Sequence, residues 1–119
     1  MNFLEIINAH VRWKERLLAH IEGRSAEKLD PAVIARDDQC QMGKWIYGDG
    51  KLFQDTPQYA QVRAEHARFH QIAANVVRHV DSGDRGAAVT LLHGDYAKIS
   101  HVLKRGIIAL SLEVKDREK

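Results

Sequence analysis

The sequence contains a single cysteine, Cys40, among its 119 residues. One thiol cannot form a disulfide within the chain, so we expect a reducing, cytoplasmic location. Long hydrophobic runs are also absent, since none approaches the roughly 20 residues that a membrane span requires. The first residues lack the basic segment and the uninterrupted apolar segment of a secretion signal. We therefore expect no association with a membrane.

The sequence also has no large excess of charge of either sign. The 18 lysines and arginines face 16 aspartates and glutamates, which gives a net charge of +2, and no block of five or more basic residues occurs. This balance excludes an extended nucleic-acid-binding surface. Hydrophobic residues make up 45% of the chain, which is enough to bury the core of one domain. Histidine, by contrast, occurs seven times, and it is the commonest metal ligand.

Apolar residues recur at three- and four-residue steps in three long segments, and no segment alternates as a strand would. We expect long helices over residues 3–22, 57–81 and 85–114. Asp30 and Thr56 each precede a proline, and Asp84 follows Gly83, so all three are expected to cap a following helix. Further short helical turns are expected after Cys40, ending at residues 48–50.

These elements predict an all-α antiparallel helical bundle of the four-helix type, in which short helices carry the cysteine. The domain is expected to span residues 1–114, with a polar, solvated tail over residues 115–119. Gly94 and Gly106 should each weaken the last helix by about 1 kcal/mol unless a neighbouring helix needs the space. The residues expected to face the core of the first helix are Phe3, Ile6, Ile7, His10, Val11, Trp13, Leu17, Leu18 and Ile21.

Four side chains form a candidate zinc site. His66 and His70 are four positions apart on the apolar side of one helix, where their Cβ atoms lie about 5–6 Å apart. His10 faces inward from the first helix, and Cys40 directly precedes a turn that would direct its thiol inward. Three imidazoles and one thiolate make a tetrahedral zinc site, and this soft ligand set favours zinc over calcium or magnesium.

The other four histidines are expected to be structural or surface residues. His20 and His79 are near helix C-termini, and His93 and His101 have no cysteine or second histidine at chelating distance in the sequence. Each of the four candidate ligands could also have a structural role without a metal, as a buried histidine bonded to a carbonyl or as a small buried thiol. A metal is favoured only because all four residues are expected to face the same part of the core. The aromatic residues Trp13, Trp45 and Phe69 are expected to pack around the site.

The sequence resembles the chemoreceptor zinc-binding (CZB) domain family in three segments that cover nearly the whole chain. These are His10-Val11-Arg12-Trp13-Lys14, Cys40-Gln41-Met42-Gly43-Lys44-Trp45-Ile46-Tyr47 and His66-Ala67-Arg68-Phe69-His70. The family motif is a histidine, then Cys-x-Leu/Met/Phe-Gly-x-Trp, then His-x-x-x-His. The resemblance implies one zinc ion held by the four matching positions, in a helical bundle that commonly forms a homodimer.

The resemblance further implies a sensor of zinc or of oxidants such as hypochlorous acid, which controls chemotaxis or cyclic-di-GMP synthesis through a chemoreceptor or a diguanylate cyclase. We expect Cys40 to be the redox switch, because oxidation of its sulfur would weaken the bond to zinc. The chain has no coiled-coil signalling region and no cyclase domain, so it is either a stand-alone member or a domain of a longer protein.

Two other functions remain open at this point. The first is a zinc-stabilised interaction module without sensing, since a site closed by four protein ligands usually stabilises a fold. The second is a hemerythrin-like iron protein, which the lack of an inward carboxylate cluster disfavours. An enzyme is not expected, because catalytic zinc keeps an open coordination position and needs a nearby general base.

Overall fold

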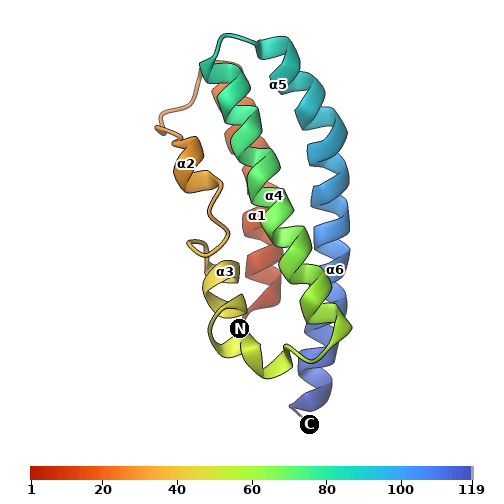
Figure 1. The fold of residues 1–119 in the computed structure, drawn as a ribbon. Coiled ribbons are helices and arrows are strands. Elements are labelled where there is room, and N and C mark those ends of the chain that lie inside the picture. The colour runs from red at the N-terminus through yellow and green to blue at the C-terminus, as the bar shows by residue number, and fades with distance from the viewer. Residues whose placement is uncertain (119) are drawn as a thin grey trace.

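Three long helices and a returning segment of short helices make up the fold (Figure 1). The computed structural model describes residues 1–118. The elements are α1 (Phe3–Ile21), α2 (Pro31–Ile34), α3 (Gln41–Ile46), the 3₁₀ helix η1 (Asp49–Phe53), α4 (Pro57–Asp81), α5 (Arg85–Leu91), the π-helical turn η2 (Leu92–Tyr96) and α6 (Ala97–Arg117). No strand occurs in these 118 residues, and the expected all-α bundle is confirmed.

The chain runs up, down, up and down the long axis of the molecule (Figure 1). His20 and Asp81, at the C-terminal ends of α1 and α4, are joined at 2.9 Å, so these two helices are parallel. Arg117 near the end of α6 is bonded to Asp55 before α4, so α6 is antiparallel to α4. The second pass consists of α2, α3 and their connectors. These short helices take the position that a fourth long helix has in a four-helix bundle.

The expected helix starts are confirmed in atomic detail. The side chains of Asp30, Thr56 and Asp84 accept hydrogen bonds from backbone N–H groups in the first turns of α2, α4 and α5. These groups have no partner within their helices, and each cap supplies one. Cys40 caps α3 in the same way, with its Sγ 3.4 Å from the N atom of Gly43.

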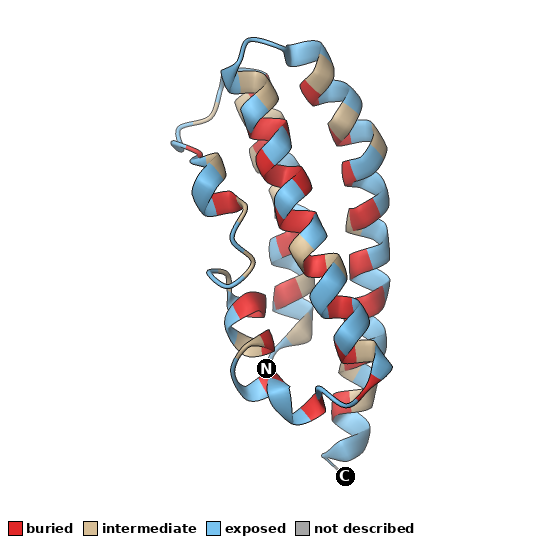
Figure 2. Cartoon of the chain, in the orientation of Figure 1, coloured by how far each residue is buried: buried red, intermediate tan, exposed pale blue. Residues whose placement is uncertain are grey.

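The buried side chains lie on the facing sides of α1, α4 and α6 (Figure 2). The expected burial of Val11 is wrong, since this residue is 53% exposed. Its Cα lies one position beyond His10, which turns its side chain about 100° away from the buried stripe. Trp13 and Leu18, also expected in the core, are only partly buried against it. Among residues 1–118, no helix is both long enough and apolar enough to cross a membrane.

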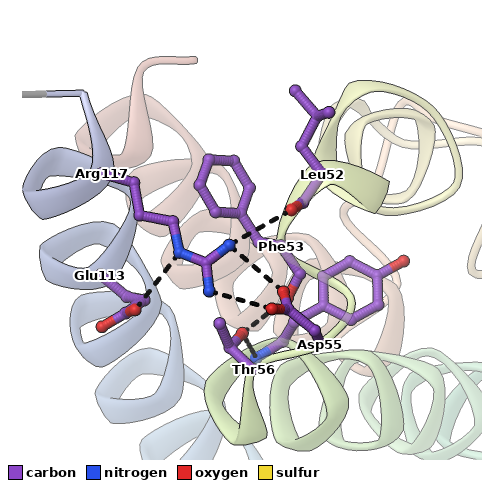
Figure 3. Close-up of polar contacts among 7 residues, drawn as sticks. Leu52, Phe53, Asp55, Thr56, Glu113 and Arg117 are labelled. Carbon is purple, nitrogen blue, oxygen red and sulfur yellow. Dashed lines mark hydrogen bonds and ion pairs between the residues drawn. The ribbon is translucent and has the colours of Figure 1, made fainter.

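The end of the chain differs from the expected polar tail. Helix α6 continues to Arg117, three residues beyond the expected end at Val114, and Lys119 lies outside the described residues. The reason is visible in Figure 3, where Arg117 bonds Asp55 and the carbonyl of Leu52 and pairs with Glu113 one turn earlier. Two more departures are local: η1 begins inside the expected break at residues 48–50, and η2 interrupts the last long helix.

Candidate metal centre

His10 projects from the middle of α1 into the core, where it is 8% exposed. Its Nδ1 donates a hydrogen bond of 2.8 Å to the carbonyl oxygen of Ile6, one turn earlier. A carbonyl can only accept, so Nδ1 carries the proton and Nε2 presents its lone pair. This orientation leaves Nε2 as the atom that His10 offers to a ligand.

His66 and His70 project side by side from α4, with their Nε2 atoms 3.1 Å apart. Both are buried, at 0% and 3% exposure. The Nδ1 of His70 donates to the carbonyl oxygen of Ile34 at 2.9 Å, so the last residue of α2 orients a ring on α4. The Nδ1 of His66 is buried and has no hydrogen-bond partner.

Cys40 reaches these rings from the second pass of the chain. Its Sγ lies 3.2 Å from the Nε2 of His66 and 3.6 Å from the Nε2 of His70. The cysteine is only partly buried, whereas all three histidines are buried. Cys40 is therefore the most exposed of the four candidate ligand residues.

Helix α3, which begins after Cys40, is fixed to the core by three contacts. Met42 and Ile46 are 0% and 1% exposed, and the hydroxyl of Tyr59 on α4 donates to the carbonyl of Ile46. Gly43 faces the backbone of the preceding connector so closely that a Cβ would lie 1.8 Å from the carbonyl oxygen of Asp37. Only a residue without a side chain allows this close approach between α3 and the connector.

The structure brings all four sequence-predicted residues together. Within residues 1–118, His10, Cys40, His66 and His70 are the one group whose ligand atoms could hold a metal ion, and these atoms lie within 4.8 Å of one another. Tetrahedral zinc with bonds of about 2.0–2.3 Å requires ligand atoms roughly 3.3–3.7 Å apart. Among Cys40, His66 and His70, the separation of 3.6 Å lies within this range and those of 3.1 and 3.2 Å are slightly shorter.

The hydrogen bonds also fit a bound cation. Because His10 and His70 give their Nδ1 protons to carbonyl groups, their unprotonated Nε2 atoms both face the same point. Converging lone pairs repel one another unless a proton or a cation lies between them. Backbone carbonyls that orient metal-bound imidazoles are a regular feature of zinc sites. The group contains no carboxylate, and such nitrogen and sulfur sets suit zinc.

Burial prepares the histidines for coordination at neutral pH. Desolvation lowers the pKa of His10 to about 4 and that of His66 to about 2, and it also lowers the pKa of His70. All three rings are therefore neutral, as metal ligands must be. Burial raises the pKa of the Cys40 thiol, so metal binding must displace a proton from this residue.

The remaining histidines and aromatic residues lie elsewhere or play supporting parts. His20, His79, His93 and His101 do not belong to the metal-site group. Phe69 packs its ring against His10 at a centroid distance of 5.1 Å and against His70 at 5.6 Å. Trp45 instead contacts Phe3 and Phe53 at the end of the bundle, and Trp13 lies under the guanidinium of Arg16.

Sequence reasoning allowed a buried histidine bonded to a carbonyl as an alternative to a metal ligand, but it did not identify the two carbonyl groups that orient the rings. The bond from His10 to Ile6 spans four residues of one helix, a spacing that could have suggested it. The bond from His70 to Ile34 joins residues 36 positions apart, and no local sequence pattern predicts it.

A helical bundle that gathers three imidazoles and one thiol around a single point is a protein of the zinc-binding class. Residues 10–77, more than half of the chain, match the family model of the chemoreceptor zinc-binding domain. The chain belongs to this family, and zinc is its metal cofactor. No curated protein and no solved structure matches the chain significantly.

Proposed function

We propose that His10, Cys40, His66 and His70 bind one zinc ion and that the domain is a regulatory sensor of zinc or of oxidants such as hypochlorous acid. The observation that carries this proposal is the contact of the Cys40 sulfur with the Nε2 atoms of both His66 and His70. Bound zinc would link α1, the α2–α3 segment and α4 through one ion. Metal occupancy would thereby be coupled to the packing of the three segments.

The four ligands are unequal, which supports a division of labour. The histidines are buried on long helices, and two of them are oriented by backbone carbonyls. Cys40 is partly exposed, and its sulfur accepts a hydrogen bond of 3.4 Å from the backbone N–H of Gly43. We propose that the histidines anchor the metal and that Cys40 is the redox switch.

The switch acts through the sulfur atom. An oxidant of the hypochlorous acid class transfers its oxygen to the thiolate, which becomes sulfenic acid while chloride leaves. The sulfur then loses its anionic charge and donates less strongly to a metal. Cys40 would detach first, because oxidation leaves the three imidazoles unchanged. The connector before α3 would then be free to move relative to α4.

The same features support a non-catalytic role. Four protein ligands leave no open position for a substrate, and the ligand group contains no carboxylate to act as a general base. The absence of carboxylates from this group also disfavours the hemerythrin-like iron alternative. A zinc-stabilised interaction module without sensing stays the second candidate, and it is favoured by the burial of the three histidines.

The family membership supports a place in bacterial-type signalling. We propose that the domain works as a homodimer and regulates a chemoreceptor or a diguanylate cyclase in the cytoplasm. The output would be chemotaxis or cyclic-di-GMP synthesis. Neither a nucleic acid nor a membrane is proposed as a partner, in line with the net charge of +2.

The test combines metal analysis with oxidation. Purified protein should contain one equivalent of zinc, and its mass in solution should be that of a dimer. Cobalt-loaded protein should show a sulfur-to-metal charge-transfer band that Cys40→Ser lacks. Addition of stoichiometric hypochlorous acid should release zinc from the native chain, and a thiol reductant should restore binding.

The matched variants separate the sensor from the structural module. We expect His66→Ala to lose zinc, Cys40→Ser to retain weakened zinc that oxidant does not release, and His101→Ala, on the exposed side of α6, to behave as the native chain. Zinc that stays bound while Cys40 is oxidised would contradict the switch and leave the structural module. Iron in the purified protein would contradict both.

A further inference from the structure

A cleft of about 410 Å³ opens directly beside the candidate metal centre. Its lining residues come from α1, α2 with the loop before it, the α2–α3 connector and α4, the elements labelled in Figure 1. Cys40 and His70 form part of its wall. Its volume is within the range of about 300–1,000 Å³ that is typical of small-molecule sites. A molecule in this cleft would lie against Cys40.

The cleft carries charges of both signs. Arg16 stacks over Trp13 at 3.7 Å and is bonded to Glu27 at 2.8 Å, so these two charges neutralise each other in one wall. The remaining charged residues of the lining are Lys28, Arg36 and Asp30. Lys28 has no ion-pair partner within residues 1–118, and Arg36 is paired only with the exposed Asp38, at 3.2 Å.

This arrangement matches one class of molecule. Two cations and one carboxylate are complementary to a peptide thiol that carries two carboxylates and one ammonium group, as glutathione does. The chain has no second cysteine that could react with an oxidised Cys40. A thiol that resolves the sulfenic acid must therefore come from outside the chain, and the cleft is an open route to the sulfur.

We propose that the cleft binds a small peptide thiol of the glutathione class, which forms a mixed disulfide with Cys40 after oxidation. The proposal rests on the function proposed above, because it needs an oxidised Cys40. An oxidant of the peroxide class converts the thiolate to sulfenic acid and is itself reduced. The peptide thiol then attacks this sulfur, an S–S bond forms, the S–O bond breaks, and the hydroxyl leaves as water with the thiol proton.

The product would hold the sensor in its metal-free state. The new disulfide places a bulky charged group where the sulfur would contact His66 and His70, so zinc could not rebind until the disulfide is reduced. The mixed disulfide also protects Cys40 from irreversible oxidation to sulfinic acid. The cleft would thus make the response both persistent and reversible.

The experiment uses the zinc-loaded full chain. Hydrogen peroxide is added with reduced glutathione, zinc release is followed with a colorimetric indicator, and the adduct is followed by intact-protein mass spectrometry. We expect one glutathionyl group per chain, located on Cys40 by peptide mapping. Cysteamine, a small thiol that carries only an ammonium group, should form its adduct more slowly than glutathione at equal thiolate concentration.

Variants of the cleft make the test specific. Lys28→Gln combined with Arg36→Gln should lower the rate of the glutathione adduct roughly fivefold and leave the cysteamine rate unchanged or higher. The matched control is Lys98→Gln combined with Arg105→Gln, two exposed positions of α6 outside this cleft, and it should react as the native chain does. Raised salt should reduce the difference between the two thiols.

The outcomes distinguish the two proposals. If zinc is released but the cleft variant, its control and the native chain form the glutathione adduct equally fast, the cleft does not bind the thiol and this inference is overturned. The sensory function would stand in that case. If peroxide does not oxidise Cys40, this inference is overturned, and the hypochlorous acid experiment above still decides the sensory function. If neither oxidant oxidises Cys40 or releases zinc, the redox function itself is wrong, and the inference that rests on it fails as well.

Discussion

The Nδ1 of His70 donates its proton to the carbonyl oxygen of Ile34 over 2.9 Å, and this bond joins the shortest helix of the fold to the candidate metal centre. Helix α2 has only four residues, so its geometry depends strongly on its cap. That cap is the side chain of Asp30, which accepts a hydrogen bond from Ala32. The Asp30 cap therefore helps to hold the Ile34 carbonyl that orients the ring of His70.

We predict that Asp30→Ala weakens zinc binding. Loss of the cap should cost about 1 kcal/mol of stability and allow Ile34 to shift, and loss of an outer hydrogen bond typically reduces metal affinity about 10-fold or more. Competition with a chromophoric chelator measures the affinity. Asp84→Ala is the control, because it removes the equivalent cap of α5 at the far end of the bundle. Equal zinc affinities in the two variants would show that α2 does not orient His70.

A second prediction concerns the glycine of the cysteine segment. Gly43→Ala places a Cβ 1.8 Å from the carbonyl oxygen of Asp37, so α3 and the connector must separate. We expect a loss of more than about 2 kcal/mol in unfolding free energy, together with loss of zinc. Gly94→Ala is the matched control, since nothing lies within 4 Å of its added Cβ and alanine favours helix. Urea unfolding of both variants gives the comparison.

These two sites show what the sequence could and could not predict. Local chemistry was sufficient for the helix starts, because Asp30, Thr56 and Asp84 each bond a backbone group within three residues. Helical spacing was sufficient for the inward orientation of the histidines. The atoms that surround the metal centre depend on long-range packing. The Ile34 carbonyl and the cleft beside Cys40 lie where α2 packs on α4, and no periodic pattern in the sequence predicts that packing.

The same distinction explains the errors. The last helix was expected to end at Val114, yet it continues to Arg117, which pairs with Asp55 and Glu113 (Figure 3). Val11 is apolar and adjacent to a buried residue, yet it is 53% exposed. In both cases the outcome depends on how other segments of the chain pack, which local sequence does not record.

A third prediction follows from the buried histidines. Their pKa values in the folded, metal-free chain are below the ordinary value of 6.5, near 4 for His10 and near 2 for His66. Below about pH 6.5 the unfolded chain takes up protons that the folded chain does not. The unfolding free energy should therefore fall as the pH falls toward about 4, by up to about 1.4 kcal/mol per pH unit for each histidine.

Urea unfolding of the chelator-treated protein at several pH values measures this dependence. His10→Gln should reduce the slope by about one proton, whereas His101→Gln, an exposed position, should leave it unchanged. A profile that is flat between about pH 7 and pH 5 would contradict the burial of neutral imidazoles. In the folded chain, His10 and His66 stay unprotonated above about pH 4, so protons compete with zinc mainly at the Cys40 sulfur, whose pKa burial raises, and zinc affinity should fall as the pH falls.

A fourth prediction concerns where the domain loosens when zinc is removed. The long helices share a continuous core, with Leu17, Phe69 and Leu103 all 0% exposed, so chelation should leave their helix content nearly unchanged. The segment before α3 has less support, because residues 35–40 include no buried side chain. It is attached through Cys40 at the metal centre and through Asp37, which accepts a hydrogen bond of 2.5 Å from the hydroxyl of Tyr47. We therefore expect faster amide exchange in this segment in the metal-free protein.

Hydrogen exchange followed by mass spectrometry measures this change peptide by peptide. Peptides from residues 35–40 should lose protection on chelation, while peptides from α3 itself should lose less, because Met42 and Ile46 remain buried and Tyr59 still bonds the Ile46 carbonyl. Cys40→Ser should show the faster exchange with or without zinc, and His101→Ala should follow the native chain. Equal loosening across α1, α3 and α4 would mean that the metal holds the whole bundle together, so Cys40 could not act as a separable ligand. A loss confined to the connector would place the moving part between α2 and α3, immediately beside the cleft.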